Sequence, residues 1–270
     1  MYKLRDWIPI ENVDIDCLCF NNHPGAIAYF EQNPEQINWL YLSDNTNACH
    51  LLEKHLYNIS WSSLARNPNA ISILEKHLDK VGFIFLSENP NALHLLEKDR
   101  NLIDWYSLSF NPNAIHLLEQ HPEMIDWNAL SRNPNALDLL VQHPEKISWF
   151  DLSLNENAIH LLEQNPDKID WTWLSLNSNA IHILEQSPKM INWSMLSKNP
   201  NAMHLLEKNR EKIDWRNLSK NPAIFTYDYE AMYQRNSALK EELMEVMFHP
   251  RNYSKFVSWG FDEFAPIEST

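Results

Sequence analysis

Hydrophobic and polar positions recur along this chain with a period of 22 residues. A Trp opens most periods, Phe83 replaces it once, and an Ala follows nine positions later. A fixed period kept over most of a chain predicts a stacked repeat protein, in which each unit buries its apolar face against its neighbours. The Trp residues of this register are Trp39, Trp61, Trp105, Trp127, Trp149, Trp171, Trp193 and Trp215.

Each period contains the start signals of two short helices. In Ile213–Leu218, Asp214 is suited to cap free backbone N–H groups, and the two terminal apolar residues form a hydrophobic staple. The second helix is predicted to begin at Asn-Pro-Asn-Ala, as in Asn199–Ala202, because Pro is favoured in the first helical turn. Helices this short are marginal alone, so stacking must stabilise them, chiefly through buried Trp. The pattern predicts an all-α fold, an α-solenoid of about nine repeats of two short helices each.

The period divides the chain into three parts. Residues 15–222 form the predicted array, whose first repeat is degenerate and has Cys17 in the Trp register. An end repeat exposes its apolar face unless something covers it. We therefore expect residues 1–14 to cap the N-terminal end of the array and residues 223–270 to form a helical cap at the other end.

The C-terminal cap is predicted to contain two helices. Glu230–Phe248 has apolar residues such as Leu239 and Leu243 on one face and charged residues on the other. Tyr253–Trp259 is predicted as a last short helix, with Gly260 at its C-terminal end.

The repeat unit I-D-W-x-x-L-S-x-N-P-N-A-I-H-L-L-E resembles the tandem repeats of uncharacterised proteins of nucleocytoplasmic large DNA viruses, the giant viruses of protists. The flanking segments Lys3–Ile8 and Glu241–Asn252 are similar to the flanks of those arrays. This resemblance implies a viral origin and synthesis in an infected cell. It implies no catalytic residues, because the family has no assigned activity.

The formal net charge of −14 narrows the range of partners. It disfavours nucleic-acid backbones and anionic membrane surfaces, which attract basic proteins. The N-terminus lacks the apolar run of a signal peptide, and no stretch has the ~20 apolar residues of a membrane span. We therefore expect the protein in the cytoplasm of the infected host cell or in the virion, and not secreted.

A histidine recurs at one position of the second helix and is the main candidate for metal chemistry. Adjacent stacked helices lie ~8–10 Å apart, whereas zinc ligands lie about 2 Å from the metal. A Glu follows each His three residues later, which favours a solvated pair on the same helix. No metal site, cofactor or catalytic constellation is expected. The histidines are His50, His94, His116, His160, His182 and His204.

Two Asn registers and one Ser register recur just as regularly. An amide is able to bind a ligand, but we interpret the Asn side chains as partners of backbone groups in the tight corner between helices. Ser recurs for similar structural reasons, as Ser131, Ser153 and Ser175 illustrate.

Positions at which the repeats differ are the best candidates for a binding surface. Several central repeats place large apolar residues in the variable slots of the first helix. On one exposed surface they would form an apolar patch with aromatic anchors, as in protein interfaces; the alternative is that they pack against neighbouring helices or the caps. These residues are Tyr106, Phe110, Phe150, Leu154, Trp173 and Leu176.

A second candidate surface is basic and lies in the last repeats. It is suited to an acidic partner or nucleic acid, and the alternative is an ordinary solvated surface. Its residues are Lys198, Lys208, Arg210, Lys212, Arg216 and Lys220.

Together these features predict a non-enzymatic scaffold that docks a host or viral protein on one face of the solenoid. One alternative is a structural component of the virion that self-associates. Another is a weak nucleic-acid binder that uses the basic C-terminal repeats. The identity of the partner and the oligomeric state stay open.

Overall fold

The computed structural model describes residues 1–98, 100–247 and 249. The chain divides into two compact units, which are described separately. The larger, Leu4–Thr226, is called the repeat unit; the smaller contains Met1–Lys3 and the chain from Tyr227 onward. The repeat unit is an α-solenoid, which confirms the predicted fold class.

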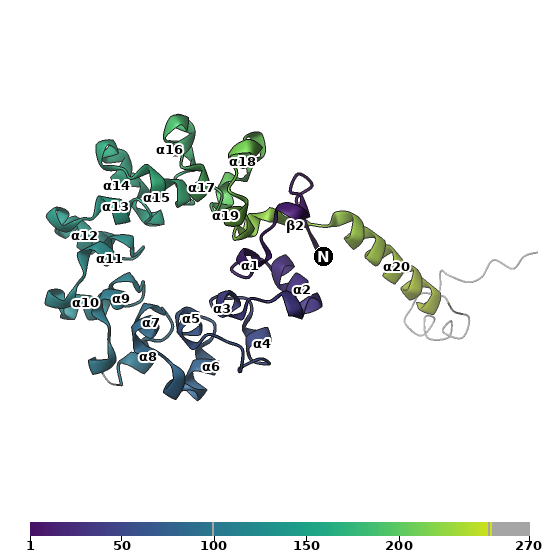
Figure 1. Ribbon diagram of the computed structural model, residues 1–270, viewed down its shortest axis with the longest axis horizontal. Helices are drawn as coiled ribbons and strands as arrows, with labels where there is room; N and C mark the ends of the chain where they lie inside the picture. Colours follow the sequence, from purple (N-terminus) through teal and green to yellow (C-terminus); the bar gives the residue numbers. More distant parts are fainter. Residues whose placement is uncertain (99, 248, 250–270) are drawn as a thin grey trace, which may run out of the picture. The chain divides into compact units, whose positions relative to one another are not determined.

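Two kinds of helix alternate along the repeat unit, the first helices on its inner side and the second helices on its outer side (Figure 1). The first helices are α1 (Ile15–Leu18), α3 (Trp39–Leu42), α5 (Trp61–Arg66), α7 (Phe83–Glu88), α9 (Trp105–Phe110), α11 (Trp127–Arg132), α13 (Trp149–Leu152), α15 (Trp171–Leu176), α17 (Trp193–Leu196) and α19 (Trp215–Ser219). The second helices are α2 (Pro24–Gln32), α4 (Cys49–Leu52), α6 (Ile71–Lys76), α8 (Leu93–Leu96), α10 (Ile115–Gln120), α12 (Leu137–Gln142), α14 (Ile159–Gln164), α16 (Ile181–Gln186) and α18 (Met203–Lys208).

Short 3₁₀ turns connect many of these helices. They are η1 (Ile10–Asn12), η2 (Pro34–Gln36), η3 (Leu78–Lys80), η4 (Arg100–Leu102), η5 (Pro122–Met124), η6 (Pro144–Lys146), η7 (Glu156–Ala158), η8 (Pro166–Lys168), η9 (Pro188–Met190), η10 (Pro200–Ala202), η11 (Arg210–Lys212) and η12 (Pro222–Ile224).

Capping side chains determine where the helices begin. The Asp214 carboxylate accepts a hydrogen bond from the Asn217 N–H at 3.0 Å, which confirms the predicted start of the first helix. The second α-helix begins later than predicted, as α18 begins at Met203. The preceding Asn-Pro-Asn-Ala segment forms a tight turn of its own, in which the Asn199 side chain accepts from the Asn201 N–H at 3.0 Å.

Two ladders of polar side chains join successive repeats, and the Ser ladder is interrupted once, at Ala65. Asn155 Nδ2 donates to the backbone oxygens of Ser131 and Asn133, at 3.1 and 2.8 Å. Ser131 Oγ accepts from the Ser148 N–H at 3.0 Å. Because the ladder residues are buried, these bonds satisfy backbone groups that water does not reach. The structural interpretation of the Asn and Ser registers is confirmed.

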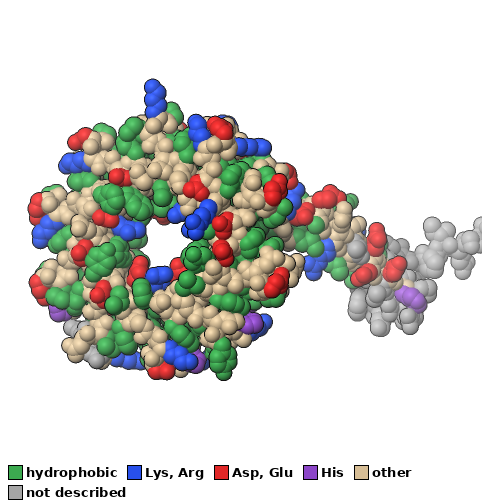
Figure 2. Space-filling view, viewed as in Figure 1, with side chains coloured by type: hydrophobic (Ala, Val, Ile, Leu, Met, Phe, Trp, Pro, Cys, Tyr) green, Lys and Arg blue, Asp and Glu red, His purple; other side chains and the backbone are tan. Residues whose placement is uncertain are grey.

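The same two ladders join the first repeat to the last. Asn21 Nδ2 donates to the backbone oxygens of Ser219 and Asn221, at 3.1 and 2.8 Å. The Asp14 N–H donates to Ser219 Oγ at 2.9 Å, and α1 packs against α19. The repeat unit is therefore a closed ring of ten repeats in the described residues, and it surrounds a central opening (Figures 1 and 2). The period alone did not predict this closure.

The first repeat has Ile15, and not Cys17, in the Trp register. Asp14 and Asn38 begin consecutive repeats 24 residues apart, because α2 is longer than the other second helices. Counting back by 22 therefore gives the wrong register. Cys19 takes the place of the ladder Ser and accepts from the Asn38 N–H at 3.4 Å; burial raises the pKa of its thiol to about 11.

Leu and Ala, rather than Trp, fill the core. Leu130 and Leu140 are 0% exposed, as are most of their equivalents, and the Ala register is buried as well. Trp127 is only half-buried, with its ring against the His143 ring at 4.9 Å and the Lys146 ammonium at 4.5 Å. The prediction that buried Trp dominates the stability was wrong, because the Trp rings cover the edge of the core.

The smaller unit contains helix α20 (Tyr229–Met247), which agrees with the helix predicted over Glu230–Phe248 as far as the residues are described. Leu239 and Leu243 of its apolar face are 51% and 57% exposed. The helix predicted over Tyr253–Trp259 lies outside the described residues.

Two short strands, β1 (Tyr2–Leu4) and β2 (Phe225–Tyr227), form a two-stranded sheet. The predicted division into an array and two caps stays a prediction. Across the described residues, no helix has both the length and the apolar character to span a membrane.

Candidate functional site

The inner side of the ring carries the positions at which the repeats differ most. We number repeat positions from the Trp, so that the ladder Asn is position 7 and the residue before it is position 6. Charged and apolar side chains both border the central opening (Figure 2). Around the ring, position 6 is occupied by Phe20, Asp44, Arg66, Glu88, Phe110, Arg132, Leu154, Leu176, Lys198 and Lys220.

Arg132 links the predicted aromatic residues into one cluster. Its guanidinium lies 5.2 Å from the centre of the Phe110 ring and 5.7 Å from that of the Trp173 ring. Phe110 contacts Tyr106 edge to face at 5.2 Å, and Trp173 contacts Phe150 in the same way at 5.6 Å. A contact between Arg132 and Trp173, two repeats away, is possible because side chains on the concave side of a ring converge. We call these five residues the Arg132 cluster.

Sequence reasoning did not identify Arg132 as part of this site, because a charged residue at position 6 is typical of an ordinary solvated surface. The signal that was available is its place directly after Phe110 in the position-6 register. Cation–π contacts of this kind favour Arg, whose flat guanidinium stacks on a ring.

The six predicted apolar residues fall into an exposed group and a half-buried group. Tyr106 and Phe150, both at position 2, are 57% and 54% exposed. The other four are half-buried and so combine packing within the ring with an accessible surface; they are Phe110, Leu154, Trp173 and Leu176. Leu40 and Ile84, also at position 2, are 54% and 58% exposed and were not among the residues predicted from sequence.

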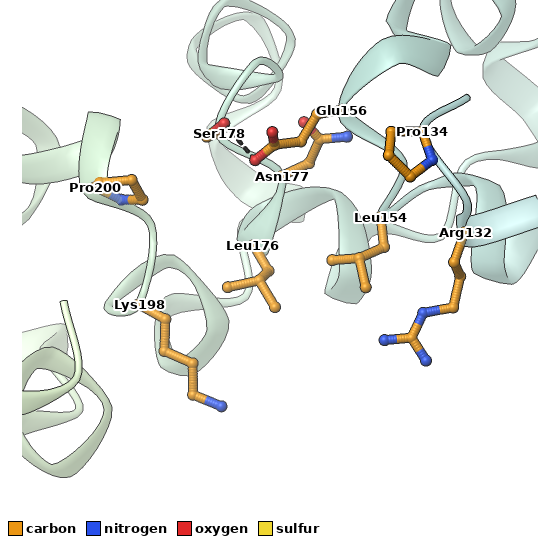
Figure 3. Close-up of a pocket in the computed structure, with 9 residues that line it drawn as sticks. All are labelled: Arg132, Pro134, Leu154, Glu156, Leu176, Asn177, Ser178, Lys198 and Pro200. Atoms are coloured by element: carbon orange, nitrogen blue, oxygen red, sulfur yellow. Dashed lines mark hydrogen bonds between the residues drawn. The ribbon is translucent and has the colours of Figure 1, made fainter. Parts of the chain in front are cut away.

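Two cavities adjoin at Arg132. One has a volume of about 450 Å³ and is lined by Ile84, Phe85, Glu88, Asp104, Tyr106, Ser107, Phe110 and Arg132. The other has a volume of about 390 Å³ and is lined by Arg132, Pro134, Leu154, Glu156, Leu176, Asn177, Ser178, Lys198 and Pro200 (Figure 3). We call the second one the leucine cavity. The predicted residues Leu154 and Leu176 therefore share a cavity with two cations.

Charges on the inner face are only partly compensated. Arg66 pairs with Asp44 at 3.4 Å. Burial raises the pKa of the Glu88 carboxyl, an effect that the positive charges of Arg66 and Arg132 oppose. Burial lowers the pKa of Lys198, and the neighbouring charge of Lys220 lowers it further.

No ion pair is formed by Arg132, Lys198 or Lys220 with any described residue. The inner face thus carries three cations that have no direct ion-pair partner among the described residues, within a chain whose net charge is strongly negative.

The predicted basic residues occupy several different surroundings. Lys198 and Lys220 lie at position 6, on the inner face, and Lys220 lies over the Phe20 ring at 5.0 Å. Lys212 lies over the Trp193 ring at 4.5 Å, the equivalent of the contact between Lys146 and Trp127.

The other three lie elsewhere. Arg210 lies over the Trp7 ring at 5.3 Å and pairs with Glu207 at 3.7 Å. Arg216 donates to Cys17 Sγ at 3.4 Å, across the junction of the first and last repeats. Lys208 is exposed at the end of α18. The structure therefore brings together Lys198 and Lys220 but not all six residues.

Most members of the histidine ladder pair between repeats, whereas His160 contacts Gln164 of its own helix at 2.8 Å. His204 Nε2 lies 2.8 Å from the Glu185 carboxylate of the preceding repeat, and His182 lies 2.9 Å from Glu163 in the same way. The expected pairing with the Glu three residues later was wrong, because adjacent second helices place the preceding Glu closer. No group of three or more His, Cys, Asp or Glu side chains suited to a metal ion occurs among the described residues.

The chain was compared with family models, curated proteins and solved structures, and a function must therefore be argued from its own fold and inner face. No family model matches the chain, and no curated protein or solved structure matches it either.

Proposed function

We propose that the ring is a non-enzymatic scaffold and that a host or viral protein docks on its inner face at the Arg132 cluster. The observation that carries this proposal is the continuous contact of Tyr106, Phe110, Arg132, Trp173 and Phe150, two of which are more than half exposed. Aromatic residues and Arg are the residue types that dominate the binding energy of protein interfaces. The viral part of the proposal rests on the repeat motif.

A rigid scaffold supports this role energetically. The Phe110 and Trp173 rings and the Arg132 guanidinium are already held against one another, so a partner orders few side chains when it binds. The Asn and Ser ladders hold the backbone of each repeat against the next one.

Proximity cross-linking in cells that produce the protein tests the proposal. Wild type is compared with Tyr106→Asp/Phe150→Asp, and Leu40→Asp/Val141→Asp serves as the control because both of its residues are exposed but lie outside the cluster. We expect the dominant partner to fall about tenfold or more in the first variant only, since the loss of aromatic anchors costs ~2 kcal/mol or more each. The same partners at the same yield in all three proteins would contradict the proposal.

A second candidate function is self-association, and the position-2 side chains favour it. Four apolar ones are each the second residue of a first helix and are each more than half exposed; they are Leu40, Ile84, Tyr106 and Phe150. Light scattering over a range of protein concentrations separates the two functions. A mass that rises with concentration, and stops rising in Leu40→Asp/Ile84→Asp, would favour self-association; a constant monomer mass would exclude it.

A further inference from the structure

We propose that the leucine cavity binds an extended peptide segment in which acidic residues flank apolar ones. This inference rests on the proposed scaffold function and gives the chemistry of the docked partner. Its basis is the order of position-6 side chains in four consecutive repeats: Arg132, Leu154, Leu176 and Lys198.

The four side chains form a row with a cation at each end. In Figure 3, Leu154 and Leu176 lie between Arg132 and Lys198, and the two cationic groups extend toward the same side of the cavity. The carboxylate of Glu156 lies on the opposite side, where it accepts a hydrogen bond from Ser178 Oγ at 2.6 Å. The apolar middle and the positive ends are therefore presented together, apart from the one lining carboxylate.

Charge complementarity identifies the ends of the ligand. Arg132 and Lys198 form no ion pair with a described residue, and Lys198 is partly buried beside Lys220. Carboxylates that approach these groups gain charge-assisted hydrogen bonds, which are stronger than neutral ones. A basic or uncharged segment gains nothing from these two cations.

The order of the side chains in the row favours an elongated ligand. Two apolar side chains separate the two cations, so a ligand that meets all four carries an apolar part between two anionic ends. An extended peptide presents its side chains in such an order, at ~3.3 Å per residue. A single compact anion offers no apolar surface to the two leucines. A nucleic-acid strand carries a charge at every step, and this charge would lie against the two leucines.

Fluorescence anisotropy with the full chain and a defined peptide series tests the inference. The probe is a labelled octapeptide with two Glu at each end and four apolar residues between them. The comparison peptides replace every Glu by Lys, or every apolar residue by Ser. A labelled oligothymidine of matched length tests the nucleic-acid alternative.

Lys198→Glu is the main variant because Lys198 stacks on no aromatic ring in the described part of the chain, and Arg132→Glu/Lys198→Glu reverses both ends. Lys208→Glu and Lys189→Glu/Lys208→Glu are matched controls with the same charge changes at exposed positions outside the cavity. Circular dichroism confirms that each variant keeps its helices.

We expect the Glu-ended apolar peptide to bind wild type and both controls, and to bind Lys198→Glu about tenfold more weakly, since a charge-assisted bond is replaced by repulsion. The double variant is expected to prefer the Lys-ended peptide. Equal binding of the Glu-ended and Lys-ended peptides, equal losses in Lys198→Glu and its control, tighter binding of the oligothymidine, or binding of no peptide would each overturn the inference.

The inference and the scaffold function fail separately. If cross-linking to a partner depends on Tyr106 and Phe150 but no peptide binds, the peptide inference is wrong and the scaffold function stands. If acidic peptides bind as expected but no cross-linked partner depends on those aromatic residues, the docking surface is the leucine cavity rather than the Arg132 cluster.

Discussion

The junction between α19 and α1 and the junction between α11 and α13 use the same hydrogen bonds, although one joins residues about 200 apart in sequence and the other neighbouring repeats. At the closing junction, Asn21 donates to two backbone oxygens at 3.1 and 2.8 Å. At the internal junction, Asn155 donates to the equivalent oxygens at the same two distances. The hydrogen bonds that join successive repeats therefore also close the ring, and the bond from Arg216 to Cys17 Sγ adds to them. Any pair of successive repeats has the matching surfaces, and the ring closes when the small rotations per repeat add up to a full turn.

The largest expected effect comes from removing a ladder Asn at each junction. In Asn21→Ala and Asn155→Ala, two backbone carbonyls lose their donor and one N–H loses its acceptor, in a buried site. We expect each to lower the free energy of unfolding by about 2–4 kcal/mol. Urea denaturation measures both, with the more exposed Asn157→Ala as the control.

The two values sharpen the comparison. If the ring is closed in solution, Asn21→Ala and Asn155→Ala cost nearly the same. A loss for Asn21→Ala that is no larger than that of the exposed control would show that the first and last repeats do not meet.

Removing the ladder Ser has a smaller effect. Ser131 Oγ and Ser219 Oγ each accept from the first N–H of the next repeat, at 3.0 and 2.9 Å. We expect Ser131→Ala and Ser219→Ala each to cost about 1–2 kcal/mol, because one buried N–H loses its partner. Thermal unfolding checks this. Ala65 already occupies this position in one internal junction, so the ring folds without one such bond. If only Ser131→Ala lowered the free energy of unfolding, the closing junction would differ from the internal one.

The inner face differs from the junctions because some of its charged side chains, such as Lys198, form no ion pair with a described residue. Burial lowers the pKa of Lys198 in the folded state, so the charged form destabilises the fold relative to the unfolded chain. This cost is fully present at pH 7 and is relieved as the pH rises through the folded-state pKa.

We therefore expect Lys198→Met to raise the urea midpoint at pH 7, and the gain to shrink at alkaline pH. Lys208→Met, at an exposed site, is the control. A lower midpoint for Lys198→Met than for the control would mean that Lys198 has a stabilising partner.

The smallest effect is expected on the outer side of the ring. His204 and Glu185 are each about half exposed, at 48% of the side chain, although they lie 2.8 Å apart. An exposed pair of this kind contributes about 0–1 kcal/mol. We expect His204→Ala to change the unfolding free energy by no more than about 0.5 kcal/mol. A loss similar to that of Ser131→Ala would show that the outer pairs hold the repeats together.

Local features of the fold were predictable because the same residues recur in each repeat. Asp214 and its equivalents mark the start of the first helix, and the fixed spacing of Leu, Ala and Asn identifies the buried registers. The burial of the Trp rings was predicted wrongly, because a large apolar residue in a fixed register suggests full burial. Trp127 instead lies at the edge of the core, between His143 and Lys146.

Long-range features were not predictable from the period. Closure depends on the curvature of the whole array, and no single residue encodes it. Because α2 is longer than the other second helices, counting back by 22 residues does not identify Ile15 as the equivalent of the Trp. At the candidate site, the aromatic residues were found from sequence, but the role of Arg132 depends on its meeting Trp173 from two repeats away.

Cross-linking across the closing junction tests the closed ring most directly. A cysteine-free background takes its replacements from sister repeats, as Cys17→Ala, Cys19→Ser and Cys49→Leu. Asp16→Cys/Arg216→Cys then places two thiols at position 2 of α1 and α19, and Asn128→Cys/Phe150→Cys places them at position 2 of α11 and α13. All four sites are exposed.

A bismaleimide that spans about 8–10 Å, the separation of packed helices, is applied to dilute protein. We predict that the Asp16/Arg216 pair forms its intramolecular cross-link at the same rate as the Asn128/Phe150 pair. A rate as low as that of Asp16→Cys/Asn128→Cys, whose sites are on non-adjacent helices, would show that the ring is open and would contradict the account.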